Sequence, residues 1–214
     1  MIPILLEWKK PKGKVVLERR PWPDVESAQY ECVVAEGGDV DIALRSINLE
    51  NPIALKYINC RTDDDLLTFV SLYGDPFGFG DLKYRPVYRY LTDTDYLELA
   101  LFALAGERQN RNRSHIEAVL HDIRLKPVFE FFDSGKARVI MSAPSLYAFM
   151  AMEVAAAGEA GATLRKCAHC QELFLIGPMT NRRDTAIYCR DRCRVYASRA
   201  RKAGKGGRDV GPET

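Results

Sequence analysis

The sequence predicts an α+β fold, in which a body of mixed strands and helices precedes a small cysteine-rich module. Two observations predict the body: short apolar runs near the N-terminus, and longer stretches of helical periodicity that begin after residue 60. The third observation is a set of four cysteines near the C-terminus, spaced as two pairs. With 214 residues, 47% hydrophobic and 28% charged, the composition is typical of a soluble globular protein.

The first predicted elements are short strands. Residues 4–8 and 15–19 are apolar runs on either side of a turn rich in lysine, proline and glycine at 9–14. A third run, residues 29–35, is closed by a pair of glycines, Gly37 and Gly38. We therefore expect β-structure in the first part of the body.

Thr62 predicts the start of a helix, because Thr62 and Asp65 have the spacing of a capping box and apolar residues follow on one side. Gly74 predicts its end. The stretch 75–89 is then expected to be a loop. Its Gly78-Phe79-Gly80 segment is interpreted as a turn and not as a phosphate-binding loop, because no strand leads into it.

A second helical region is predicted from residue 92 toward 125, and its polar middle at 106–113 suggests a division into two helices. Residues 126–132 and 137–142 predict a hairpin. Pro144 suits the first turn of a further helix that runs to Gly158.

The four C-terminal cysteines predict a metal site. Cys167 and Cys170 form a CxxC pair, and Cys189 and Cys193 follow after eighteen further residues, spaced so that both sulfurs lie on one face of a helix. Four thiolates suit a tetrahedral Zn²⁺ and leave no open position for catalysis, so the expected zinc is structural. A turn and a helix start that bind one ion form a treble-clef arrangement.

Two other functions are compatible with cysteines and histidine in this segment. A thioredoxin-type redox site needs several strands and a helix after its CxxC, whereas only 44 residues follow Cys170. His169 offers an alternative ligand, but it stands between two better-spaced sulfurs and is expected to be exposed. The remaining cysteines, Cys32 and Cys60, are isolated and are expected to be buried free thiols.

The N-terminus lacks the pattern of a signal peptide, and no apolar run reaches the roughly 18 residues that a membrane span requires. We therefore expect a cytoplasmic protein without a membrane partner, in a reducing compartment where paired cysteines bind metal more often than they form disulfides. No nucleophile elbow, phosphate-binding loop or zinc-protease motif is present, so enzymatic activity is not expected.

Charge is distributed unevenly along the chain. Residues 165–208 contain twelve Lys or Arg and three Asp or Glu, whereas residues 1–164 carry a formal net charge of −5. Arginine outnumbers lysine in the predicted helix after Cys189, and its planar guanidinium binds phosphate oxygens in pairs. The candidate nucleic-acid contacts are the basic residues of this region: Arg182, Arg183, Arg190, Arg194, Arg199, Arg201 and Lys202.

The helix after Cys189 also has a predicted inward side. At 100° per residue, the two cysteines share a sector with Tyr196, Ala197 and Ala200, which would face the rest of the protein. The alternative to phosphate binding is a solvated helix whose arginines only offset the acidic body.

The cysteine and arginine pattern resembles a widespread bacterial treble-clef zinc finger. The segments that carry this resemblance are Cys167-x2-Cys170, Arg182-Arg183-Asp184, Tyr188-Cys189-x3-Cys193-Arg194 and Ala197-x-Arg199-x-Arg201.

The layout of a mixed body before the finger is similar to that of the CGNR zinc-finger proteins. Asn59 and the residues after it also resemble a segment of that family's N-terminal domain. Gln171 stands where such zinc-binding turns often have glycine. The resemblance implies a regulator that binds nucleic acid.

These observations predict three regions: a body over residues 1–160, a zinc finger with a basic helix over 161–204, and a flexible tail over 205–214. The small-residue segment Ala155–Gly161 is the expected boundary between the first two. The expected function is binding of DNA or RNA in transcriptional or other regulation. The alternative is a protein-interaction or ligand-sensing module, in which the body binds a protein or a small molecule and the finger is purely structural.

Overall fold

The computed structural model describes residues 4–22, 25–37, 40–78, 84–105, 113–121, 123–131 and 135–205. The α+β prediction is confirmed. In chain order, the elements are β1 (Ile4–Pro11), β2 (Val15–Trp22), β3 (Val25–Ala35), β4 (Val40–Ser46), α1 (Ile53–Ile58), α2 (Asp63–Tyr73), β5 (Tyr84–Pro86), α3 (Val87–Ala105), α4 (Arg113–Leu120), β6 (Lys126–Phe131), β7 (Ala137–Ser142), α5 (Leu146–Glu159), β8 (Thr163–Lys166), β9 (Leu173–Ile176) and α6 (Asp191–Lys205). Within the described residues, no helix is both long and apolar enough to cross a membrane.

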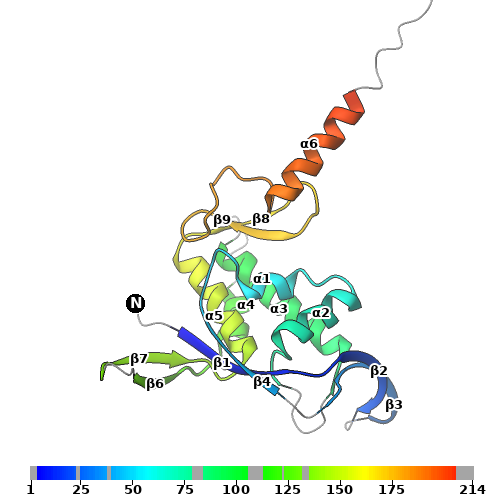
Figure 1. The fold of residues 1–214 in the computed structure, drawn as a ribbon, viewed down its shortest axis with the longest axis vertical. Helices are drawn as coiled ribbons and strands as arrows, with labels where there is room; N and C mark the ends of the chain where they lie inside the picture. The colour runs from blue at the N-terminus through cyan, green and yellow to red at the C-terminus, as the bar shows by residue number, and fades with distance from the viewer. Residues whose placement is uncertain are drawn as a thin grey trace, which may run out of the picture.

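The described strands form two sheets and a separate hairpin (Figure 1). One sheet has the order β4-β1-β7-β6, with β1 antiparallel to β4 and parallel to β7. The second has the order β2-β3-β5, and β8 pairs with β9 alone. Because β1 and β2 belong to different sheets, the lysine-rich turn between them links the sheets and does not close a hairpin. The predicted hairpin of β6 and β7 is confirmed.

Local sequence signals set the start and end of α2 as predicted. The Thr62 side chain accepts a hydrogen bond from Asp65 N, and the Asp65 side chain accepts one from Thr62 N, which completes the capping box. Gly74 ends the helix with a positive φ of 83°. For α5 the expected start was wrong: Ser145 is the N-cap, accepting from Ala148 N, and Pro144 precedes it.

The loop expected over residues 75–89 is wrong at its C-terminal end. Residues 84–86 form β5, which pairs with β3, and α3 begins at Val87 instead of residue 92. The three residues of β5 are too few to show a strand pattern, and their pairing with β3 decides the structure. Residues 79–83, and the polar segment 106–112 between α3 and α4, lie outside the described residues.

The main hydrophobic core lies where α1, α3 and α5 meet, and it extends to α2 and to the β8–β9 hairpin. The side chains of Tyr57, Leu97, Leu101, Phe149 and Met150 are among its fully buried members. No break in this core separates residues before 160 from those after it, because Leu164 and Leu175 of the hairpin belong to it. The segment expected to be a boundary ends α5, and a turn at Gly161 with a φ of 70° then leads into β8. The domain division itself stays a prediction.

Two buried polar groups in the body carry no sequence signal. Asp75 accepts a hydrogen bond from the Tyr90 hydroxyl and forms an ion pair with Arg85, which also pairs with Asp93 at 2.6 Å. Glu153 of α5 reaches the start of α1, where Pro52 offers no side-chain cap, and accepts from Ala54 N at 2.8 Å. Both groups fix helices of the core to their neighbours.

Candidate metal centre

The first cysteine pair lies in the turn of the β8–β9 hairpin. Gln171 N donates to Cys167 O at 3.0 Å, and Cys167 N donates to Glu172 O at 2.8 Å, so the chain folds back tightly after Cys170. Gln171 has a φ of 64°. This left-handed conformation is what glycine adopts without strain, so glycine would also fit this position.

The second pair lies at the start of α6. Cys189 comes just before the helix and Cys193 is in its first turn, where Cys193 N donates to Arg190 O at 3.1 Å. Cys189 N also donates to the Cys167 sulfur at 3.4 Å, which ties the two pairs together through the backbone.

The structure brings all four sulfurs into one cluster, in which they lie within 4.8 Å of one another. The Cys189 sulfur is 3.5 Å from that of Cys170 and 3.6 Å from that of Cys193. A tetrahedral ZnS₄ site with bonds of about 2.3 Å has sulfurs about 3.8 Å apart, whereas a disulfide requires about 2.05 Å. The spacing therefore fits four ligands around one metal ion.

The surroundings of Cys167 favour a thiolate. Burial alone raises the pKa of this thiol, but backbone N–H groups of Cys170, Cys189 and His169 stabilise the charged form and lower the pKa to about 6. Cys167, Cys189 and Cys193 are buried, and only Cys170 is exposed. N–H groups directed at a sulfur are the supporting contacts that a metal-bound thiolate requires.

Strand β9 joins the cysteine cluster to the body because both of its faces are buried. Leu173 and Leu175 belong to the main core, whereas Phe174 and Ile176 pack with Cys167, Cys189 and Cys193 in a second core. Alternate side chains of a strand point to opposite faces. The four apolar residues of β9 therefore pack against the body on one face and against the metal site on the other.

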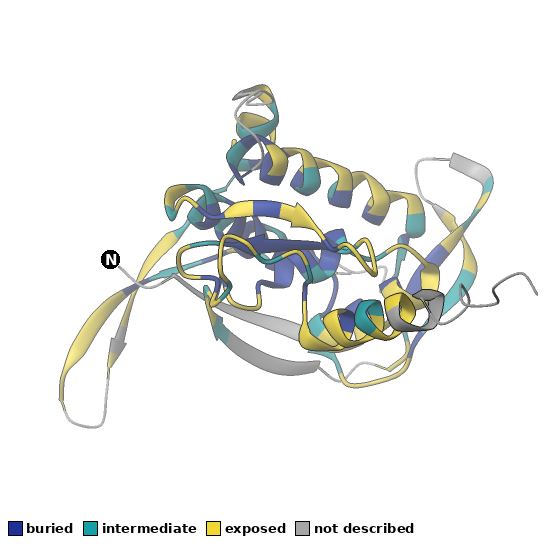
Figure 2. Cartoon of the chain, turned by 90° about the horizontal axis from the view of Figure 1, so that it is seen from above, coloured by how far each residue is buried: buried dark blue, intermediate teal, exposed yellow. Residues whose placement is uncertain are grey.

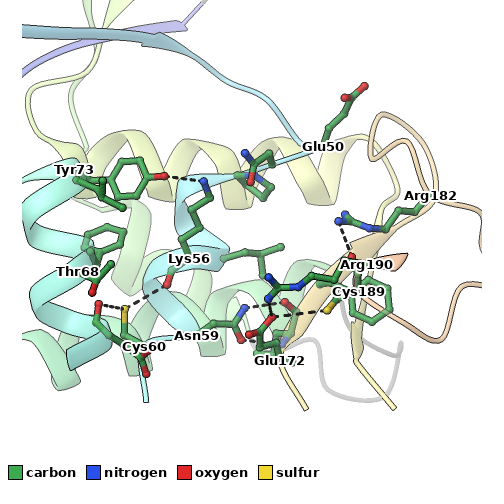
Figure 3. A pocket seen from close by; sticks show the side chains of 18 residues that line it. Glu50, Lys56, Asn59, Cys60, Thr68, Tyr73, Glu172, Arg182, Cys189 and Arg190 are labelled. Atoms are coloured by element: carbon green, nitrogen blue, oxygen red, sulfur yellow. Dashed lines mark hydrogen bonds and ion pairs between the residues drawn. The ribbon is translucent and has the colours of Figure 1, made fainter. Parts of the chain in front are cut away.

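Asn59 of the body binds β9 by two hydrogen bonds. Its side-chain nitrogen donates to Leu173 O and its side-chain oxygen accepts from Leu173 N, each at 2.8 Å (Figure 3). Asn59 is itself the C-cap of α1. The asparagine therefore connects the end of a body helix to the β-strand that follows the first cysteine pair.

Two of the candidate nucleic-acid contacts support the module itself. Arg182 donates to Cys189 O at 3.0 Å and lies over the Phe174 ring, and Arg190 forms an ion pair with Glu172 (Figure 3). A Glu172 side-chain oxygen also lies 3.7 Å from the Cys189 sulfur. These arginines fix the segment between the two cysteine pairs.

The other candidates are exposed. Arg183 lies in the loop before α6, and Arg194, Arg199 and Arg201 lie along the helix, where Arg194 forms an ion pair with Asp191 at 3.1 Å. The helix extends away from the body, and most of its surface is exposed (Figures 1 and 2). The side chain of Lys202 and residues 206–214, most of the expected tail, lie outside the described residues.

The predicted inward side of α6 is therefore right for Cys193 and fails toward the end of the helix, and Cys189 is buried just before the helix begins. Cys193 is 5% exposed, but Tyr196 is 39% exposed and Ala200 is also exposed. The cause is the direction of the helix: its first turn meets the cysteine cluster, and the later turns extend past it. Helical periodicity identifies a face but not how far along the helix that face has a neighbour.

Cys32 and His169 have the burial expected from the sequence, and Cys60 is less buried than expected. Cys32 is fully buried, whereas Cys60 is half-buried and its thiol donates to Lys56 O at 3.3 Å. Burial raises the pKa of Cys60 to about 12, so this thiol is unreactive. His169 is exposed, with its ring 5.7 Å from that of Tyr196.

Comparison with known proteins finds no matching family model and no matching curated protein. What the structure establishes is a zinc-finger-like cluster of four cysteines that can bind a metal ion. Membership of the CGNR family and the treble-clef class stays a prediction from the sequence pattern.

Proposed function

We propose that this chain is a nucleic-acid-binding regulator, in which a structural Zn²⁺ fixes an arginine-rich helix for contact with phosphates. The ion is zinc because four thiolates in a closed site suit Zn²⁺ better than a hard cation. The zinc has no free coordination position, so its role is to fold the module and set the direction of α6.

The proposal rests on the direction of α6, which extends away from the body. Beyond Cys193 the helix leaves the core with Arg199 and Arg201 exposed, and neither forms an ion pair in the described part of the chain. Exposed guanidinium groups on a projecting helix can reach the phosphates of a nucleic acid without rearrangement of the body.

The experiment is a salt titration of binding, using fluorescence anisotropy with mixed-sequence DNA and RNA. Each phosphate contact contributes about 0.7–0.9 to the slope of log K against log salt. Arg199→Ala/Arg201→Ala should therefore lower the magnitude of that slope by about 1.5, with the zinc content unchanged. The matched control is Arg19→Ala/Arg124→Ala, which removes two exposed arginines of the body and should leave the slope as it is.

Equal losses from the two double variants would assign the binding to overall charge and not to α6. Wild-type protein that shows no salt-sensitive binding to either nucleic acid would refute the proposal.

A protein-interaction role is the second candidate, and one observation favours it. Strand β6 is at the edge of its sheet, and its Phe129 and Phe131 side chains are 66% and 77% exposed. Exposed aromatic residues on an edge strand are typical of a protein contact. Binding to a protein through this surface would depend on Phe129 and Phe131 and would change little with salt, which separates it from the first proposal.

A further inference from the structure

A groove of about 590 Å³ lies between the body helices and the metal module (Figure 3). Its walls come from α1 and α2 on one side and from β9 and the segment before α6 on the other. The volume is in the range of small-molecule sites, which is about 300–1,000 Å³. The groove joins parts of the chain that lie more than a hundred residues apart, since Asn59 and Leu173 both line it and are hydrogen-bonded across a separation of 114 residues.

The carboxylates that line the groove are mostly engaged by the protein. Asp65 accepts from the backbone N–H groups of Arg61 and Thr62, and Glu172 pairs with Arg190. Glu50 is exposed at the rim. A ligand inside the groove therefore finds the carboxylates of Asp65 and Glu172 already bonded within the protein.

The lysine that lines the groove is different, because no carboxylate forms an ion pair with it in the described part of the chain. Lys56 Nζ donates one hydrogen bond, to the Tyr73 hydroxyl at 2.7 Å, and lies 5.1 Å from the centre of the Tyr73 ring. An ammonium group has three donors, so two remain for a ligand. The side chain is half-buried, which makes an unpaired charge costly and an anionic partner favourable.

The module side of the groove supplies a second cation. Arg182 donates one N–H to Cys189 O, and its guanidinium lies 5.8 Å from the centre of the Phe174 ring. Within the described residues, no carboxylate forms an ion pair with it. Leu55 of α1 and Leu72 of α2 add apolar surface to the lining of the groove. A cation on each wall of a groove that is partly lined by apolar side chains defines the chemistry of the occupant.

We propose that this groove binds a small organic acid, a carboxylate or phosphate ester with an apolar or aromatic body. Its acidic group would pair with Lys56, and its body would lie against Leu55 and Leu72, within reach of Arg182. Such a ligand would contact the body and the Cys189 segment at once, so it would bias the position of the metal module. The site involves no residue of α6 and does not depend on nucleic-acid binding.

The test is a titration of the full ¹⁵N-labelled, metal-loaded chain with phenyl phosphate, followed by amide chemical shifts. The expected result is saturable binding in the millimolar range or tighter, with shifts in α1, α2 and residues 172–190. Lys56→Gln should weaken binding by about tenfold, because one charge-assisted contact is lost. Lys56→Arg should restore it. Lys166→Gln, an exposed lysine of β8 that does not line the groove, is the matched control and should change the affinity by less than about twofold.

Phenylacetate, inorganic phosphate and benzyl alcohol complete the set of probes. Phenylacetate binding with the same dependence on Lys56 supports the site, and the tighter of the two acids identifies the preferred acidic group. Weaker binding of inorganic phosphate than of phenyl phosphate supports the apolar wall. Equal binding of benzyl alcohol, shifts confined to α6, equal effects of Lys56→Gln and Lys166→Gln, or no binding of either acid would each overturn the proposal.

Discussion

Replacing Asn59 with alanine should destabilise the whole protein, because this side chain holds β9 to the body. Two hydrogen bonds of 2.8 Å are lost, and both the N–H and the carbonyl of Leu173 lose their partner at a half-buried position. Each lost hydrogen bond costs about 1 kcal/mol, and leaving a buried group without a partner raises that cost, so the expected decrease in the free energy of unfolding is about 2–3 kcal/mol. For a chain of this size, that corresponds to a fall in Tm of about 5–10 °C.

The assay is urea unfolding of the zinc-loaded protein, followed by circular dichroism and by release of zinc to a chelating dye. If the body and the metal module share one core, both signals shift together in Asn59→Ala. Asn48→Ala is the control: its side chain accepts one hydrogen bond from Glu50 N in an exposed turn, and its loss should cost about 0.5 kcal/mol or less. Equal costs for the two variants, or a shift in zinc release alone, would show that Asn59 does not couple the two parts.

Further predictions concern the body, the turn of the first cysteine pair and the buried aspartate. Burial raises the pKa of Glu153 to about 7, above the roughly 4.3 of an unfolded glutamate, so its contribution to stability is complete below that lower value and is lost as the pH rises through 7. Glu153→Gln should therefore gain stability relative to wild type as the pH rises from about 4.3 to 8, by about 3 kcal/mol in total and mostly below pH 7, in paired urea unfolding at each pH; a constant difference would contradict this. Gln171→Gly should raise the free energy of unfolding by about 0.5–1 kcal/mol, because Gln171 has a φ of 64°, whereas His169→Gly, at a residue without positive φ, should not. Tyr90→Phe should lower Tm, because it removes a hydrogen bond of the buried Asp75 and costs about 1–3 kcal/mol; an unchanged Tm would show that Asp75 has enough support from Arg85.

Local signals account for what the sequence predicts well. The capping box of Thr62 and Asp65 sets the start of α2, and the spacing of the four cysteines identifies the cluster, because both depend on residues close in the chain. The hairpin of β6 and β7 is another local feature.

Contacts between distant segments account for what was missed. The Asn59–Leu173 pair spans 114 residues, and Glu153 caps α1 from 99 residues away. Nothing near Asn59 or Glu153 in the sequence marks these partners. The sequence predicts Arg182 and Arg190 as phosphate contacts because they lie near other basic residues. Only the structure shows that Arg182 binds Cys189 O and that Arg190 binds Glu172. Asn59 stood in a segment that resembles a known family, and this was the one signal that could have singled it out.

Four cysteines that hold one zinc ion would fix the direction of α6. X-ray absorption of the metal in natively purified protein, together with elemental analysis, tests this directly. We expect one zinc per chain, with four sulfur neighbours at about 2.3 Å. Fewer than four sulfurs, a nitrogen ligand from His169, or a chain that folds without zinc would contradict it.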